Sequence, residues 1–138
     1  MTPKKTFGLL FVLLSLPIYL SGSTDRFVGE WKATNNGITK VQIRLSRNQL
    51  KLRAFGACHP QDCDWGEVDV QAYVPEVCLR LNDTAEVISA QFVMGFAKKL
   101  LIAYPMGTDQ LRVETFTVFT DTSGRSPYHS VTIMTRTD

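Results

Sequence analysis

The residues best able to do chemistry are concentrated in residues 56–68, which read GACHPQDCDWGEV. Two cysteines, one histidine and two aspartates lie there within seven positions, and a tryptophan follows directly. Two thiols can form a disulfide, thiolate, imidazole and carboxylate groups can bind zinc, and a thiol beside a base can act as a nucleophile. Three kinds of site are therefore open at this stretch, and each makes different demands on the chain.

A disulfide between Cys58 and Cys63 is the leading prediction. The four residues between them include Pro60 and are enough for a bridged loop to reverse direction. In an oxidising compartment outside the cytoplasm, pairing is the default state of two such cysteines. A bridge across so short a loop would fix the connection between two strands and contribute about 2 kcal/mol by reducing the entropy of the unfolded chain.

A metal site is the first alternative, because zinc accepts thiolate, imidazole and carboxylate ligands together. If the cysteines are oxidised, the remaining ligands would be His59, Asp62, Asp64 and the distant His129. The cysteine spacing matches none of the paired Cys-x2-Cys arrangements that identify a zinc site. The sequence therefore predicts that the protein has no cofactor. The alternative is a protein that binds zinc or another divalent cation, or a metal-dependent hydrolase.

A catalytic thiol is the second alternative. Cys58 would need a base beside it, but side chains of neighbouring residues on an extended chain, such as His59, point to opposite sides. The sequence contains no Gly-x-Ser-x-Gly, no His-Glu-x-x-His and no phosphate-binding loop. The residues therefore favour a binding protein over an enzyme.

The first 23 residues are predicted to be a secretory signal peptide, with an uncleaved N-terminal anchor as the alternative. Lys4 and Lys5 precede an apolar run from residue 7 to residue 20, and small residues follow. That order is typical of a secretory signal, and the run is short for a transmembrane helix. Residues 20–23 (LSGS) are similar to a bacterial lipoprotein box, except that Ser23 replaces the lipid-accepting cysteine. We therefore expect residues 24–138 to form one exported domain, periplasmic or extracellular, without a lipid anchor or a transmembrane span.

The charge balance argues against a nucleic-acid partner. The chain has 15 Lys plus Arg and 13 Asp plus Glu, so loss of Lys4 and Lys5 with the signal leaves 13 basic against 13 acidic residues. The net charge of residues 24–138 is then zero, whereas a nucleic-acid-binding domain usually carries a basic surplus.

The pattern of residues 24–138 predicts an all-β domain. Almost every segment alternates apolar and polar side chains with a period of two, which is typical of half-buried antiparallel strands. About eight such segments are joined mostly by short polar turns. Eight sequential strands can bury their apolar faces by closing into an up-and-down barrel or by forming a β-sandwich. We predict the eight-stranded antiparallel barrel, with the sandwich as the alternative.

One predicted strand changes phase along its length. Leu111 and Val113 alternate in one phase, whereas Phe116 and Val118 alternate in the other. An extra residue in one strand would restore the apolar residues to the same face, so the pattern predicts a β-bulge at residues 114–117.

The first and last predicted strands carry a resemblance that favours the barrel. Gly29, Glu30 and Trp31 are similar to the Gly-x-Trp signature of the calycin superfamily, which includes lipocalins, fatty-acid-binding proteins and avidins. In such barrels a basic residue of the last strand often lies over the tryptophan, and the resemblance gives that place to Arg136.

A second resemblance covers nearly all of residues 24–138. The string CHPQDCDWGEV, with FVGEW and GITK before it and VETFTVFTDTSGRSPYH after it, closely resembles a family of bacterial secreted or multidomain proteins marked by a Cys-His-Pro-x-Asp-Cys-Asp-Trp-Gly motif. The resemblance implies an intact exported domain and brings no activity with it. Cys78 is not part of the motif, so it is either buried or free to link a dimer, with a monomer favoured.

The loops are expected to form a binding rim, because barrels carry function at their mouths and loops. The expected ligand is a small molecule, a glycan or a protein, and a calycin-like inhibitor or an envelope interaction protein is a further alternative by analogy. Trp65 is out of phase with the inward residues that follow it, so it is expected against the loop or in solvent. The candidate binding residues are His59, Asp62, Asp64, Trp65, Arg125, Tyr128 and His129.

Overall fold

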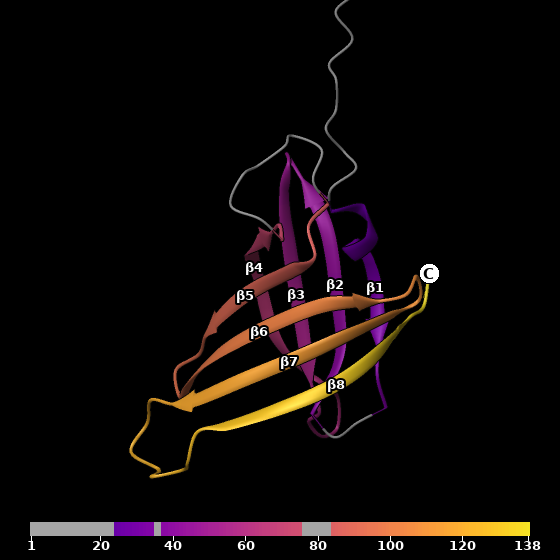
Figure 1. The fold of residues 1–138 in the computed structure, drawn as a ribbon. Helices are drawn as coiled ribbons and strands as arrows, with labels where there is room; N and C mark the ends of the chain where they lie inside the picture. Colours follow the sequence, from indigo (N-terminus) through magenta and orange to yellow (C-terminus); the bar gives the residue numbers. More distant parts are fainter. Residues whose placement is uncertain (1–23, 35–36, 76–83) are drawn as a thin grey trace, which may run out of the picture.

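The structure is a computed structural model that describes residues 24–34, 37–75 and 84–138. Eight antiparallel strands, each hydrogen-bonded to the next, close into a barrel where β1 meets β8 (Figure 1). The predicted eight-stranded antiparallel barrel is confirmed. The predicted signal peptide and Cys78 lie outside the described residues. A 3-10 turn η1 (Asp25–Phe27) precedes the strands, which are β1 (Gly29–Lys32), β2 (Ile38–Ser46), β3 (Gln49–Gly56), β4 (Cys63–Tyr73), β5 (Val87–Val93), β6 (Ala97–Met106), β7 (Gln110–Phe119) and β8 (Tyr128–Arg136).

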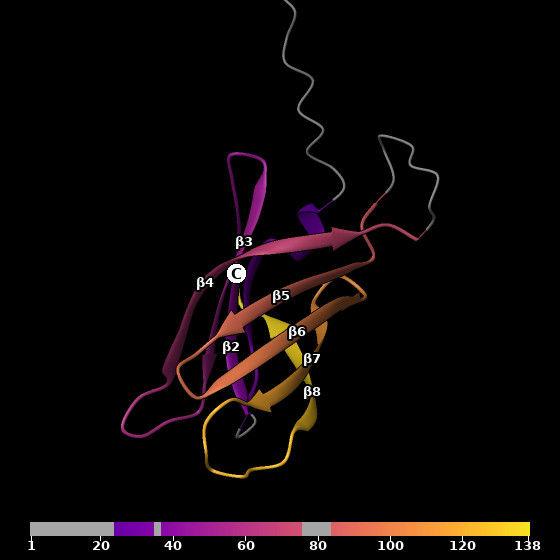
Figure 2. The same ribbon diagram turned by 90° about the vertical axis from the view of Figure 1, so that its left-hand side faces the viewer.

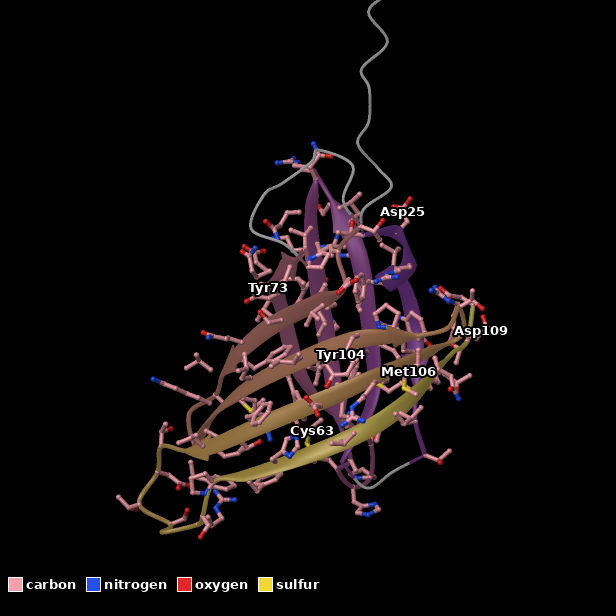
Figure 3. All side chains as sticks on the ribbon, viewed as in Figure 1. Asp25, Cys63, Tyr73, Tyr104, Met106 and Asp109 are labelled. Carbon is pink, nitrogen blue, oxygen red and sulfur yellow. A yellow bond between two sulfur atoms is a disulfide. The ribbon has the colours of Figure 1, made fainter. Side chains whose placement is uncertain are left out.

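The two ends of the barrel are built differently. The loops β3–β4 and β7–β8 lie at the same end (Figure 2), which we call the disulfide end. Cys63 marks this end, and Asp25 and Tyr73 lie at the other (Figure 3). A difference between the side chains at the two ends therefore indicates which end carries a functional site.

The end away from the disulfide is closed by η1 and by contacts around Trp31. The indole Nε1 of Trp31 donates a hydrogen bond of 3.0 Å to the carbonyl oxygen of Phe27, whose own side chain is fully buried. The Arg136 guanidinium lies 4.1 Å from the centroid of the Trp31 ring and donates to the carbonyl oxygens of Val28 and Arg26. Arg136 thus takes the place over the tryptophan that the Gly-x-Trp resemblance implies.

Large apolar side chains fill the barrel next to this closed end. They point inward at alternate positions and are almost completely removed from solvent, which supplies the main favourable term in folding. This part of the interior is packed with the buried side chains of Trp31, Leu52, Ile88, Leu101, Leu111, Val113 and Met134.

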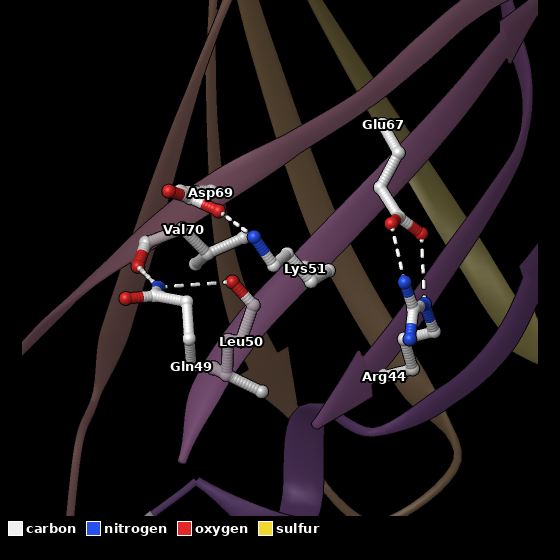
Figure 4. A network of polar contacts seen from close by, with 7 residues as sticks. All are labelled: Arg44, Gln49, Leu50, Lys51, Glu67, Asp69 and Val70. Carbon is white, nitrogen blue, oxygen red and sulfur yellow. Dashed lines mark hydrogen bonds and ion pairs between the residues drawn. The ribbon is translucent and has the colours of Figure 1, made fainter. Parts of the chain in front are cut away.

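Charged residues on the outer surface help to set the strand register. Lys51 forms an ion pair with Asp69, its partner on β4, as the alternation of charges leads one to expect. Arg53 is opposite Glu67 in the register, but Glu67 instead accepts hydrogen bonds of 2.9 and 2.6 Å from Arg44 (Figure 4). These exposed pairs form a solvated face of the sheet, where water and salt screen the charges, so they contribute little to stability.

The predicted bulge in β7 is wrong. β7 pairs with β6 and with β8 without any shift of register. Thr115 and Thr117 continue the inward phase of the strand and are 4% and 1% exposed, whereas Phe116 and Val118 point outward and are 39% and 50% exposed. The phase of the apolar residues changes because the barrel interior turns polar toward the disulfide end, and the backbone stays regular.

Candidate functional site

The predicted disulfide is present and closes the β3–β4 loop. Cys58 and Cys63 are bonded, with their Cα atoms 5.4 Å apart. Cys63 is the register partner of Gly56, so the bridge follows directly on the last β3–β4 pair. The loop is also held to β2, because Thr39 donates a 2.6 Å hydrogen bond to the carboxylate of Asp62. The bridge therefore fixes one side of the barrel mouth.

The alternative metal ligands are dispersed. His59 is exposed in the bridged loop, Asp62 accepts a hydrogen bond from a threonine, and Asp64 accepts hydrogen bonds from the Arg53 side chain and from the backbone of Gly66. His129 lies on the outward side of β8. Across residues 24–34, 37–75 and 84–138, no three His, Cys, Asp or Glu side chains form a group that could hold a metal ion. The zinc alternative stays a prediction, and the described part of the structure does not bring its ligands together.

His129 belongs to the outer surface of the barrel. Its ring stacks on Phe116 with the centroids 4.5 Å apart, and its Nε2 lies 3.7 Å from the Glu114 carboxylate. Hydrogen bonds from Tyr104 and Arg112, and the charge of Arg112, lower the pKa of Glu114. This cluster joins β6, β7 and β8 on their outer side and takes no part in the barrel mouth.

Trp65 lies inside the barrel mouth, where it is partly buried and packs against the core. The register between β3 and β4 shifts beside it, where β4 carries one more residue than β3, and Gly66 has a φ of +89°. This bulge turns the indole inward, where it meets Phe92 edge-on at a centroid distance of 5.7 Å. A Cβ atom at Gly56 would lie 2.9 Å from the indole, so only glycine leaves room for the ring there.

A cavity of about 650 Å³ opens at the disulfide end of the barrel. Ligand pockets in proteins are typically about 300–1,000 Å³. We call this cavity the cup. Its bridged side is formed by the disulfide, and the side chains that give it chemical character are Trp65, Phe96, Lys99, Phe119, Arg125 and Tyr128.

Lys99 is the most unusual residue of the cup. It points into the barrel from β6 and is only 9% exposed. Its Nζ donates hydrogen bonds to the hydroxyls of Thr117 (3.0 Å) and Tyr128 (3.3 Å) and lies 4.8 Å from the ring centroid of Trp65. Among the residues that the structure describes, no carboxylate forms an ion pair with it. Buried lysines are rare without a paired charge.

Hydroxyl groups surround Lys99 on the inner wall. Thr117 hydrogen-bonds to Tyr128, and this bond, together with the nearby charges of Lys99 and Arg125, lowers the pKa of Tyr128. Deeper in the wall, the hydroxyls of Thr115 and Ser130 lie 2.5 Å apart. The inward faces of β6, β7 and β8 are therefore polar near the mouth.

Arg125 forms part of the rim. It lies in the β7–β8 loop, with its guanidinium 3.9 Å from the ring centroid of Phe119 and 5.8 Å from that of Phe96. It donates hydrogen bonds of 2.9 Å to Asp121 and to Ser123 in the same loop. Since Arg125 already has a carboxylate partner, its charge is compensated within the loop.

Four of the seven binding residues predicted from the sequence line the cup together, namely Asp64, Trp65, Arg125 and Tyr128. The sequence reasoning missed Lys99, although Ala97, Lys99, Leu101 and Ala103 follow one phase. The opposite phase of the same strand is just as apolar, so the alternation could not say which side faced inward.

An exposed apolar surface was also missed. Phe116, Val118, Val131 and Ile133 point outward from β7 and β8 and are each at least 39% exposed. We call these four residues the outer apolar face. Phe116 and Val118 are the two members of this face that the wrongly predicted bulge would have turned inward.

Comparison with known proteins finds no family model, no curated protein and no solved structure that matches the chain. The resemblances to the calycin superfamily and to the Cys-His-Pro-x-Asp-Cys-Asp-Trp-Gly family stay predictions. Among the described residues there is no helix with the length and apolar character needed to span a membrane.

Proposed function

We propose that the protein is a non-enzymatic binding module that takes a small molecule into the cup. The observation that carries the proposal is a preformed cavity of about 650 Å³ with a buried lysine in its wall, at one end of a barrel whose other end is solid. A small β-barrel with a disulfide-bridged loop fits such a role. The signal-like first 23 residues make the periplasm or the extracellular space the expected place of action.

The polar half of the interior is difficult to explain by packing alone. Burying a hydroxyl or an ammonium group removes its hydration, and hydrogen bonds compensate only part of that cost. The solid half shows that the chain can fill the same barrel with apolar side chains. Where polar residues occupy an interior that is otherwise apolar, a functional site is the usual reason.

The fixed geometry of the mouth also supports binding. The Cys58–Cys63 bridge restrains one side, and the Arg125 network restrains the β7–β8 loop on the other. A ligand that enters a preorganised cavity loses less free energy in ordering the protein.

The proposal is tested by thermal unfolding with a library of small organic acids, bases and sugars. A compound that binds only the folded state raises the unfolding temperature in proportion to its affinity and concentration. Ser130→Leu adds bulk to the inner wall of the cup and should abolish the shift. Thr135→Leu makes a similar change at an exposed site on the same strand and should leave the shift intact. Equal shifts in all three proteins would place binding elsewhere.

A protein contact through the outer apolar face is the second candidate, since four large apolar residues are exposed on two neighbouring strands and exposed apolar surface can mark a protein interface. We take a second copy of the chain as the partner to test, by sedimentation velocity over a wide concentration range. Val118→Lys should suppress self-association, and Val93→Lys, at an exposed valine of β5 outside this face, should not. A monomer at every concentration would remove this candidate.

A further inference from the structure

The geometry points to a small aromatic carboxylate as the ligand of the cup, with its charge on Lys99 and its ring against the aromatic walls around Trp65. This inference rests on the proposed function and names the chemical class that the same site selects.

The charge of the ligand follows from the charges of the cup. Arg125 at the rim has Asp121 as its partner, and Asp64 at the mouth has Arg53. Lys99 is the deeper cation, and the described part of the chain gives it no counterion. A buried ammonium group with only neutral partners has lost hydration without gaining an opposite charge. A ligand carboxylate would supply that charge and form a charge-assisted hydrogen bond.

The donors of the cup suit a carboxylate with two oxygen atoms. An ammonium group has three protons, and Lys99 uses two of them on Thr117 and Tyr128. The Tyr128 oxygen accepts a hydrogen bond from Lys99, and the bond from Thr117 lowers the pKa of Tyr128, as a bond accepted by the phenol oxygen does. With both neighbours as donors, the phenol proton is free to be donated into the cup. The Lys99 Nζ and the Tyr128 oxygen are 3.3 Å apart, a spacing that lets one carboxylate accept a hydrogen bond at each oxygen.

The walls and depth of the cup select a short, flat ligand. Trp65, Phe96, Phe119 and Tyr128 give it four aromatic side chains, which favour stacked or edge-on contact with a ring. Below Lys99 the next inward residue of β6, Leu101, is fully buried in the solid core. A long acyl chain would find no continuing channel, whereas one or two rings fit a cavity of about 650 Å³.

The test compares 2-naphthoate with its neutral analogue 2-naphthamide by isothermal titration calorimetry on residues 24–138 as exported. A hydrogen bond to a charged group is worth about 1.5–3 kcal/mol, so the naphthoate should bind about tenfold to hundredfold more tightly than the amide. Lys99→Met should reduce naphthoate binding to the level of the amide. Lys98→Met changes the adjacent, exposed lysine on the outer side of the same strand and should have no effect.

Lys99→Gln provides a second variant, because it keeps a polar side chain in the same position if methionine disturbs the fold. Equal affinity for naphthoate and naphthamide, or naphthoate binding that survives both Lys99 variants, would overturn the inference about charge. If other compounds of the library stabilise the protein and naphthoate does not bind, the inference fails and the proposed function stands. If no compound stabilises the protein and neither probe binds, both fail.

Discussion

At the scale of the residue, two adjacent lysines show how position decides the role of a side chain. Lys98 and Lys99 have the same chemistry, but the alternation of β6 places the first in solvent and the second inside the barrel. The exposed lysine keeps its hydration at no cost. The buried lysine is a charge whose burial lowers the stability of the fold. Such a cost is expected of a residue that is retained for binding.

Lys99→Met should stabilise the protein while weakening anion binding. Replacing a buried charge by an apolar side chain of similar length removes the desolvation cost and is expected to raise the free energy of unfolding by about 1 kcal/mol or more. Urea unfolding monitored by circular dichroism would measure the change, with Lys98→Met as the control. A loss of stability in Lys99→Met larger than that in Lys98→Met would show that the lysine is structural.

Gly66 should be required for the position of Trp65. Its φ of +89° is a conformation that L-residues with a side chain rarely adopt, although a Cβ there would meet no other atom. Gly66→Ala is therefore expected to cost about 1–2 kcal/mol through backbone strain alone and to increase the exposure of Trp65. Tryptophan fluorescence together with urea unfolding would detect both effects.

The matched control for this glycine is Gly95→Ala. Gly95 also has open space around its missing Cβ, but its φ lies outside the left-handed range. We expect this variant to be close to neutral. Similar losses in both variants would show that the strain at Gly66 is not what positions the indole.

At the scale of the element, β7 explains what the sequence could and could not predict. Its strand character and the shared phase of Leu111 and Val113 were evident from alternation. Its second half has threonines inside and Phe116 and Val118 outside, and alternation alone identifies two faces without saying which one is buried. The assumption that the apolar face must be inward led to the wrong bulge, because the interior is polar there. A polar interior is decided by tertiary closure of the barrel, which a local pattern cannot contain.

The bulge that does exist, in β4 at Trp65, was equally hidden. The sequence showed Trp65 out of phase with the strand, and that was the signal of an irregularity. The glycine that follows it was the residue able to adopt the required conformation. The two features together indicate an indole turned into the barrel, whereas the tryptophan alone led to the expectation that it lies against the loop or in solvent.

The cluster of Tyr104, Arg112, Glu114 and His129 lies on the outer side of β6, β7 and β8. It predicts that the stability of the protein depends on pH. Hydrogen bonds from Tyr104 and Arg112 lower the pKa of Glu114 below its ordinary value of 4.5. The unfolded chain therefore binds a proton at this residue more readily than the folded protein does. The stabilising contribution is fully present above about pH 4.5 and is lost as the pH falls through the lower, folded pKa.

Glu114→Gln should consequently be less stable than the wild type at neutral pH, and the difference should shrink on acidification. Urea unfolding across the acid range would measure it. Glu86→Gln, at an exposed glutamate, is the control and should show no such trend. A difference that stays constant with pH would mean that Glu114 acts through packing and not through its charge.

At the scale of the whole molecule, the barrel divides its two tasks between its ends. The end with η1, Trp31 and Arg136 is closed and supplies the apolar core, and the disulfide end is open and carries the polar cup. The number and order of strands could be predicted because alternation and short turns determine them. Which end would stay open could not, since it depends on side chains from strands that are distant in the sequence.

Removal of the disulfide should affect the mouth more than the fold. The Cys58→Ser, Cys63→Ser double variant is expected to lose about 2 kcal/mol of stability through loop entropy and still form the barrel. Because the bridge borders the cup, ligand affinity should fall as well. Calorimetry and chemical unfolding on the same samples would compare the two losses. An unchanged affinity would show that the bridge stabilises the loop without shaping the cup.

The central claim is that the cup binds a small molecule, and nuclear magnetic resonance mapping tests it most directly. A compound that raises the unfolding temperature would be titrated into ¹⁵N-labelled protein. The account predicts that the resonances that move first belong to the Trp65 indole and to the backbone at Lys99, Thr117 and Tyr128. Shifts confined to the outer apolar face, with the cup residues unchanged, would contradict it.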